Sequence, residues 1–137
     1  MGLNFEPFGR CLQTLERSLR CLDSAQEDTV EYEVYRNSVI KSFEMTLEMA
    51  GKSLRRVLRE FSGNPKSVNE LTFKDVFRHA AKHGLVTDVE RWFRYRESRN
   101  NTVHDYGEDF AETVLVMIQE FYRDASVLHQ DLVRKYG

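Results

Sequence analysis

The chain has 137 residues, 41% of them hydrophobic and 31% charged, which is typical of one soluble globular domain. Its formal net charge of -2 excludes the overall positive field of proteins that bind nucleic acid non-specifically, so any nucleotide or RNA binding must come from a local cluster. Neither an N-terminal signal pattern nor a run of eighteen apolar residues is present, which predicts a cytoplasmic protein without a membrane span. We expect one domain over residues 1–137.

Cysteine and histidine spacing predicts neither a disulfide nor a metal site. Cys11 and Cys21 lie in one predicted helix, about 15 Å apart, which is too far for a disulfide. His79 and His83 are four residues apart, but no further ligand completes a recognisable metal-binding pattern. We therefore expect no metal and no cofactor.

Apolar side chains recur at intervals of three and four residues, which predicts helices in most of the chain. The first spans about 8–24 and follows Pro7, whose missing N–H costs least at a helix start. The second is long, about 30–62, and ends at Gly63, a typical C-terminal cap. Residues 64–71 are expected to form a loop.

Two short helices and a third long helix complete the predicted order. Thr72 begins the first short helix and Gly84 ends it, while Thr87-Asp88-Val89-Glu90 matches a capping box that opens the second. The last helix is expected over about 108–135. The predicted fold is all-α, an antiparallel up-and-down helical bundle of three long helices plus a short helical pair.

The segment between the last two predicted helices does not fit a simple bundle. It reads Arg99-Asn100-Asn101-Thr102-Val103-His104-Asp105-Tyr106-Gly107 and contains several poor helix formers. In an uninterrupted helix Arg99 and His104 would lie about 140° apart. A helix break near Asn100 would bring the two side chains together.

An arginine beside a histidine is suited to phosphate chemistry. The Arg99 guanidinium can bind phosphate oxygens in a bidentate manner, and the His104 imidazole exchanges protons near neutral pH. Tyr106 adds a hydroxyl that can act as a donor or a nucleophile. The alternative is structural: Arg99 contacts carbonyls at a helix end, His104 is hydrogen-bonded in the interior and Tyr106 packs. Composition alone favours this alternative.

Two other groups of charged residues leave alternatives open. Glu44, Glu48 and Lys52 recur every four residues and form either a ladder of ion pairs, each worth about 0.2–0.5 kcal/mol, or a polar strip that lines a groove. The fourth predicted helix carries four arginines that do not share one stripe, so a solvated face is favoured over a phosphate-binding patch; they are Arg91, Arg94, Arg96 and Arg99.

Three ordered patterns resemble a known family. Arg99-Asn100-x-x-x-His104-x-Tyr106 resembles the R-x4-H motif, with its trailing tyrosine, of the HEPN superfamily of small helical bundles. The stretch 43–54, FEMTLEMAGKSL, is similar to a signature of the nucleotidyltransferase substrate-binding branch, which usually has a bulky residue in place of Gly51. Phe77-x-x-Ala80-x-x-x-Gly84-Leu85-Val86, followed by Trp92, also resembles that branch.

This resemblance implies a non-catalytic, homodimeric subunit that pairs with a separately encoded minimal nucleotidyltransferase. Arg99, with Asn100 beside it, and His104 would bind phosphate or ribose, and the cleft would be lined by Glu44, Glu48 and Lys52. The chain is not expected to be a complete nucleotidyltransferase, because it contains no Gly-Ser dipeptide and its single Asp-x-Glu, at Asp88, is explained as a helix cap.

One departure from the branch implies an alternative. His104-Asp105-Tyr106-Gly107 is closer to HEPN ribonuclease toxins that are neutralised by nucleotidyltransferase antitoxins. By that likeness the chain would be a metal-independent endoribonuclease. His104 would assist attack of a ribose 2′-hydroxyl, Arg99 would stabilise the developing charge, and Tyr106 would receive AMP. Whether the chain is an enzyme stays open, and a purely scaffolding bundle is the third alternative.

Overall fold

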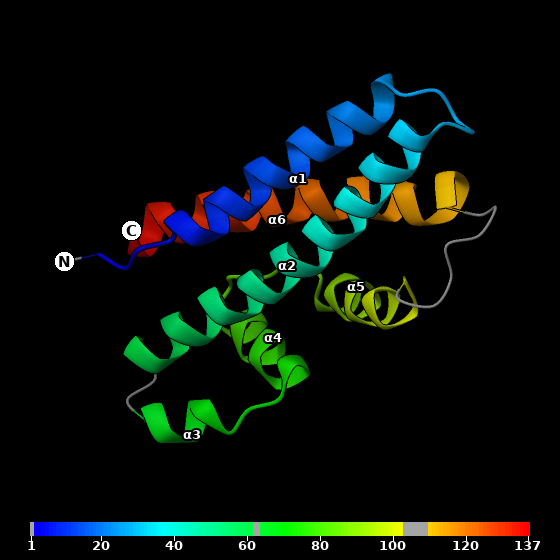
Figure 1. Cartoon of the computed structure of the whole chain (residues 1–137). Helices are drawn as coiled ribbons and strands as arrows, with labels where there is room; N and C mark the ends of the chain where they lie inside the picture. Colours follow the sequence, from blue (N-terminus) through cyan, green and yellow to red (C-terminus); the bar gives the residue numbers. More distant parts are fainter. Residues whose placement is uncertain (1, 62–63, 103–109) are drawn as a thin grey trace.

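The computed structural model describes residues 2–61, 64–102 and 110–137, and in these ranges every regular element is a helix. The elements are α1 (Glu6–Ser24), α2 (Val30–Phe61), α3 (Pro65–Asn69), α4 (Phe73–Lys82), α5 (Val89–Thr102), the π-helical turn η1 (Phe110–Val114) and α6 (Leu115–Tyr136) (Figure 1). The prediction of an all-α bundle is confirmed.

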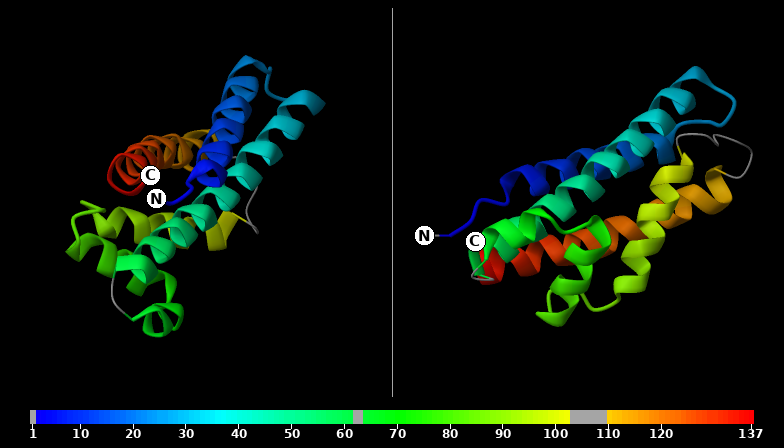
Figure 2. Two further views of the ribbon diagram at one scale, coloured as in Figure 1. Left: turned by 90° about the vertical axis from the view of Figure 1, so that its left-hand side faces the viewer. Right: turned by 90° about the horizontal axis from the view of Figure 1, so that it is seen from below.

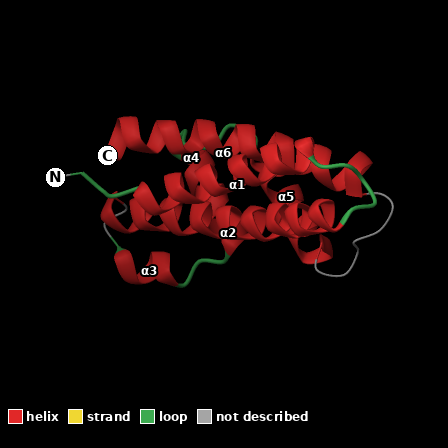
Figure 3. Ribbon diagram, turned by 45° about the horizontal axis from the view of Figure 1, so that its top comes forward, coloured by secondary structure: helices red, strands yellow, loops and turns green. Residues whose placement is uncertain are grey.

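The three long helices form the body of the bundle. α1 and α2 make an antiparallel hairpin with the most extensive contact in the described part, and α6 packs against both (Figures 1 and 3). α4 and α5 contact each other and α2, and two further views show them on one side of the long helices (Figure 2). The short α3 packs against α2.

The prediction of a loop over residues 64–71 was wrong, because Pro65–Asn69 form the short helix α3. The Asn64 side chain accepts a hydrogen bond from the Ser67 N–H at 3.2 Å, and Pro65 supplies a preset backbone angle at the first turn. The Arg55 guanidinium also donates to the Val68 carbonyl at 2.7 Å. These tertiary and capping contacts stabilise a helix too short to be seen in the apolar spacing.

Helix starts were predicted well, with one correction. Thr72 accepts from the Asp75 N–H and caps α4 as expected. At α5, however, the hydrogen bond is made by the Asp88 carboxylate, which accepts from the Arg91 N–H at 3.3 Å. Asp88 rather than Thr87 therefore caps α5, and the helix begins one residue later than the capping box predicts.

Gly51 allows α4 to lie close to α2. It is buried, and a Cβ built on it would lie 3.2 Å from the Phe73 ring. Phe73 therefore occupies the space that a larger side chain at this position of α2 would need.

An aromatic cluster joins α2, α5 and α6. The Phe121 ring, fully buried on α6, makes edge-to-face contacts with Phe43 of α2 at 5.0 Å between centroids and with Trp92 and Tyr95 of α5 at 5.8 and 5.2 Å. Such contacts add to the hydrophobic gain of burying the rings. Phe121 is thus the point at which the three helices meet.

A polar clamp beside this cluster fixes α5 to α6. The Arg91 guanidinium is 2.9 Å from both Glu120 Oε1 and Asp124 Oδ2, and the Tyr95 hydroxyl donates to the Asp124 carboxylate. Burial, and then the hydrogen bond to Asp124, raise the pKa of Tyr95 well above its ordinary value. Tyr95, which is 2% exposed, therefore stays protonated far into the alkaline range.

Replacing Phe121 tests the aromatic cluster. We expect Phe121→Ala to lower the free energy of unfolding by about 3–5 kcal/mol and Phe121→Leu, which leaves a smaller cavity, by clearly less. Urea unfolding monitored by circular dichroism measures both. An alanine variant as stable as the leucine variant would contradict the proposed packing role.

Because of the clamp, the free energy of unfolding should depend on pH in the alkaline range. Because the pKa of folded Tyr95 lies above that of the unfolded chain, its contribution is intact below about pH 10 and is lost as pH rises further, by at most about 1.4 kcal/mol per pH unit. We expect Tyr95→Phe to be less stable at pH 7 by about 1 kcal/mol and to decline less steeply above pH 10. Urea unfolding of both proteins between pH 7 and 11 tests this, and parallel curves would refute it.

Candidate functional site

Arg99 lies half-buried near the C-terminal end of α5. Arg91, Tyr95 and Arg99 follow one another every four residues and share a face of α5, so the clamp to α6 also fixes the face that carries Arg99. Figures 1 and 2 show this end of α5 at the end of the bundle that holds the α1–α2 connection and the start of α6. The guanidinium is therefore carried on a rigid element, as a binding site needs.

α5 continues through Asn100 to Thr102, so the helix does not break at Asn100 itself. Asparagine and threonine cost only about 0.5 kcal/mol each in a helix, and the anchored preceding turns of α5 outweigh that cost. Asn100 is exposed. His104 and Tyr106 lie outside the described residues, so their approach to Arg99 stays a prediction.

The described chain resumes in η1, where an α-helix was expected. The π-helical turn leads directly into α6, and its first residue, Phe110, is buried. Such turns are rare and are frequently found at functional sites. A small cavity of about 160 Å³ borders this turn and is lined by the carboxylates of Glu27, Asp28 and Glu33 together with Arg36. Three acidic residues against one guanidinium do not favour an anion in this cavity.

The three residues predicted to form a polar strip on α2, Glu44, Glu48 and Lys52, differ in their surroundings. Lys52 and Glu48 form an exposed ion pair at 3.5 Å, as the ladder alternative expects, and Glu44 is half-buried. Lys52 also lines a cavity of about 350 Å³ together with three arginines of α2, and Arg99 is not among its lining residues. Lys52 and Arg99 therefore border different parts of the surface.

The arginines of α5 do not form one patch. Arg91 belongs to the clamp, the Arg96 guanidinium lies over the Phe73 ring at 4.8 Å from its centroid, and Arg94 is exposed. The spacing of Arg91 and Tyr95 was the signal that could have revealed the clamp, because both point to the side that α6 covers. The clamp was not predicted, because the sequence does not show that α6 lies beside this face of α5.

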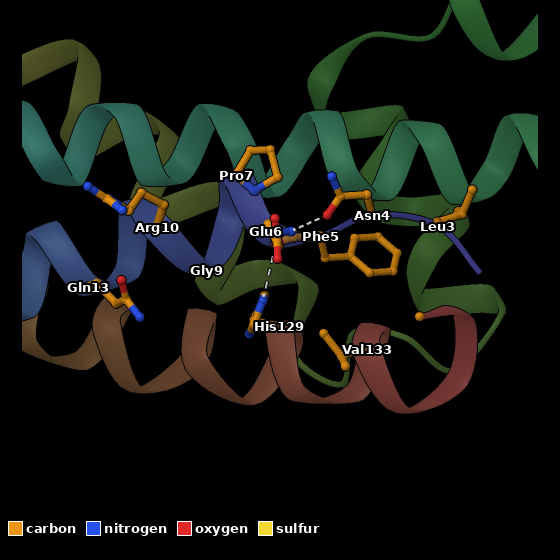
Figure 4. A pocket seen from close by; sticks show the side chains of 11 residues that line it. Leu3, Asn4, Phe5, Glu6, Pro7, Gly9, Arg10, Gln13, His129 and Val133 are labelled. Carbon is orange, nitrogen blue, oxygen red and sulfur yellow. Dashed lines mark hydrogen bonds between the residues drawn. The ribbon is translucent and has the colours of Figure 1, made fainter. Parts of the chain in front are cut away.

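A large cavity of about 800 Å³ lies between the start of α1 and the end of α6 (Figure 4). His129 on its wall packs edge-to-face on Phe8 and hydrogen-bonds the Phe5 carbonyl at 3.3 Å. Gly9 makes this possible, since a Cβ there would lie 3.0 Å from the ring. His129 thus attaches α1 to α6, and this packing role accounts for its contacts.

Within the described ranges, no group of three or more histidine, cysteine or carboxylate side chains is arranged to bind a metal ion. No helix in the same ranges is long and apolar enough to cross a membrane.

Comparison with known proteins identifies the family. A family model for proteins like the nucleotidyltransferase substrate-binding protein matches residues 3–134. In sequence the chain is 33% identical over 93 residues to the probable ribonuclease HepT of Haemophilus influenzae, a match that covers 68% of this chain and 64% of the relative.

Solved structures show the same fold. HI0074 of Haemophilus influenzae, described as the fold of a substrate binding domain of a nucleotidyltransferase, superposes with a TM-score of 0.81 at 26% identity and covers 94% of this chain and 98% of its own. A tri-AMPylated HEPN toxin of Shewanella oneidensis, solved in complex with its MNT antitoxin, reaches 0.65 at 18% identity, over 96% of this chain and 98% of its own. The resemblance predicted from three short patterns is confirmed, and the chain belongs to the nucleotidyltransferase substrate-binding-protein-like family.

Proposed function

We propose that this protein is the non-catalytic helical subunit that holds substrate for a separately encoded minimal nucleotidyltransferase. The observation that carries the proposal is the family match over residues 3–134, together with the likeness of the whole fold to a substrate-binding domain. The nucleotidyltransferase would supply the metal-binding carboxylates and the turn that receives a triphosphate. This subunit would supply the wall of the site that faces the substrate.

The residues of this chain support that division of labour. Asp88, the aspartate of its single Asp-x-Glu, caps α5 through the Arg91 N–H and so has a structural task. Arg99 is a guanidinium on a helix that the clamp holds in place, which suits bidentate binding of phosphate oxygens. We propose that Arg99 and His104 contact phosphate or ribose, with Asn100 beside them.

The remaining assignments are expectations about the complex. Glu44, Glu48 and Lys52 would face the groove between the two proteins, where the exposed Lys52–Glu48 pair can exchange partners at little cost. A homodimer would place two copies of the Arg99 segment near one another. Both would act in the cytoplasm.

Arg99→Ala in the presence of the partner tests the main proposal. The protein and the nucleotidyltransferase encoded beside it should elute together from a size-exclusion column. We expect Arg99→Ala to keep that complex but to weaken substrate binding about 10- to 100-fold, the usual loss for a charge-assisted hydrogen bond. Arg94→Ala, an exposed arginine on the same helix, is the control and should bind normally. Two proteins that never associate would refute the proposal.

A ribonuclease is the second candidate, favoured by the 33% identity to a probable ribonuclease HepT. In that reaction His104 would take the proton of a ribose 2′-hydroxyl as its oxygen attacks the adjacent phosphorus, and the 5′-oxygen would leave. Arg99 would stabilise the negative charge on the phosphate oxygens. Tyr106 would be the acceptor of AMP from a nucleotidyltransferase.

His104→Ala separates the two candidates. We expect the purified protein to leave RNA intact if it is only a binding subunit, and to cleave RNA without added metal if it is a nuclease. In the nuclease case His104→Ala should lower cleavage at least 100-fold, and gel electrophoresis of labelled RNA measures this. Cleavage that persists in His104→Ala would exclude the proposed mechanism.

A further inference from the structure

A cavity with concentrated positive charge lies between the N-terminal segment and the C-terminal half of α2. Its volume is about 350 Å³, and its wall carries the four cations of Lys52, Arg55, Arg56 and Arg59, here called the basic cleft. None of its lining residues in the described part of the chain is an aspartate or glutamate. In a protein with a formal net charge of -2, this is a local excess of positive charge.

The guanidinium groups are held in place by neutral acceptors. Arg56 Nη1 donates to the Asn4 carbonyl at 3.1 Å, and Arg59 Nη1 donates to Asn69 Oδ1 at 3.2 Å. Neither of these arginines forms an ion pair with a carboxylate of the described residues. Each guanidinium is therefore oriented by a neutral acceptor while its charge is not neutralised, which favours binding of an anion.

The other two cations have different tasks. Arg55 donates to the carbonyls of Val68 and Leu71 at 2.7 and 2.9 Å and so attaches the α3 segment to α2, while its residue also lines the cleft. Lys52 pairs with Glu48 at 3.5 Å, but both side chains are more than half exposed, so this pair is weak. An incoming phosphate can compete for Lys52.

The spacing of the cations indicates more than one phosphate. Lys52, Arg56 and Arg59 share one stripe of α2 and extend over about 10 Å along its axis. We propose that the basic cleft binds a ligand with two or more closely spaced phosphate groups, the chemistry shared by nucleoside triphosphates and single-stranded RNA. Pro7 and Met49 add apolar surface at its edge for a base or ribose.

This cleft is separate from the Arg99 region. The C-terminal half of α2 and the C-terminal end of α5 lie toward opposite ends of the bundle (Figure 1). Binding at the basic cleft does not require Arg99 to contact phosphate, so the two proposals can fail independently.

Arg56→Gln/Arg59→Gln tests the proposal, with Arg20→Gln/Arg134→Gln as the matched control. Each double variant removes two exposed or partly exposed arginine charges, and the control arginines, on α1 and α6, do not line the cleft. The probes are ATP, by isothermal titration calorimetry, and a labelled ten-nucleotide RNA, by fluorescence anisotropy. We expect at least a tenfold loss of affinity in the cleft variant and less than twofold in the control.

The outcome identifies the ligand. A loss confined to RNA, with a salt dependence reduced by about 1.4 in its logarithmic slope, indicates the backbone of RNA, and a loss confined to ATP indicates a nucleotide. Equal losses in both double variants, or no binding of either probe by the unaltered protein, would overturn the proposal. Circular dichroism checks folding, and Arg56→Gln alone, an exposed position, replaces the double variant if that one unfolds; a loss below twofold would then also overturn it.

Discussion

The junction of α5 with α6 is the contact on which the rest of the structure depends. Phe121 contacts rings from α2 and α5, and beside it Arg91 and Tyr95 bind the carboxylates of α6. α5 is polar in composition and also contacts α2 and α4, and the junction adds the ion pairs and ring contacts that attach it to α6. Because Arg99 follows on the same face of α5, the junction also orients the residue on which the proposed function rests.

The molecule divides its arginines between structure and binding according to their acceptors. Arg91 is opposed by two carboxylates and its charge is used within the fold. Arg56 and Arg59 are opposed by a carbonyl and an amide, which fix their geometry but leave their charge available. This difference cannot be seen in a count of basic residues. It explains how a chain with a slight excess of negative charge can still present a surface suited to phosphate.

The family gives two related readings of the same fold. A solved relative is described as a substrate-binding domain of a nucleotidyltransferase, and a curated relative is named a probable ribonuclease. Both readings would use an arginine held near a histidine, since binding a phosphate and stabilising its transition state need the same guanidinium. What separates them is whether the histidine acts as a base on a ribose hydroxyl, which is a question of proton transfer rather than of fold.

The sequence by itself determined α1, α2, α4, α5 and α6, because apolar residues every three or four positions form one face of a helix that packs on a core. Its capping residues at Thr72 and near Thr87 located two helix starts to within a residue. It also determined the family, through patterns around Gly51, Trp92 and Arg99. Only the tertiary structure decided which polar side chains meet. The clamp, the anchoring of α3 by Arg55 and the basic cleft join residues far apart in the chain, and such contacts leave no periodic signal. For the same reason the helix could pass through Asn100, since packing of its preceding turns outweighs a small local preference.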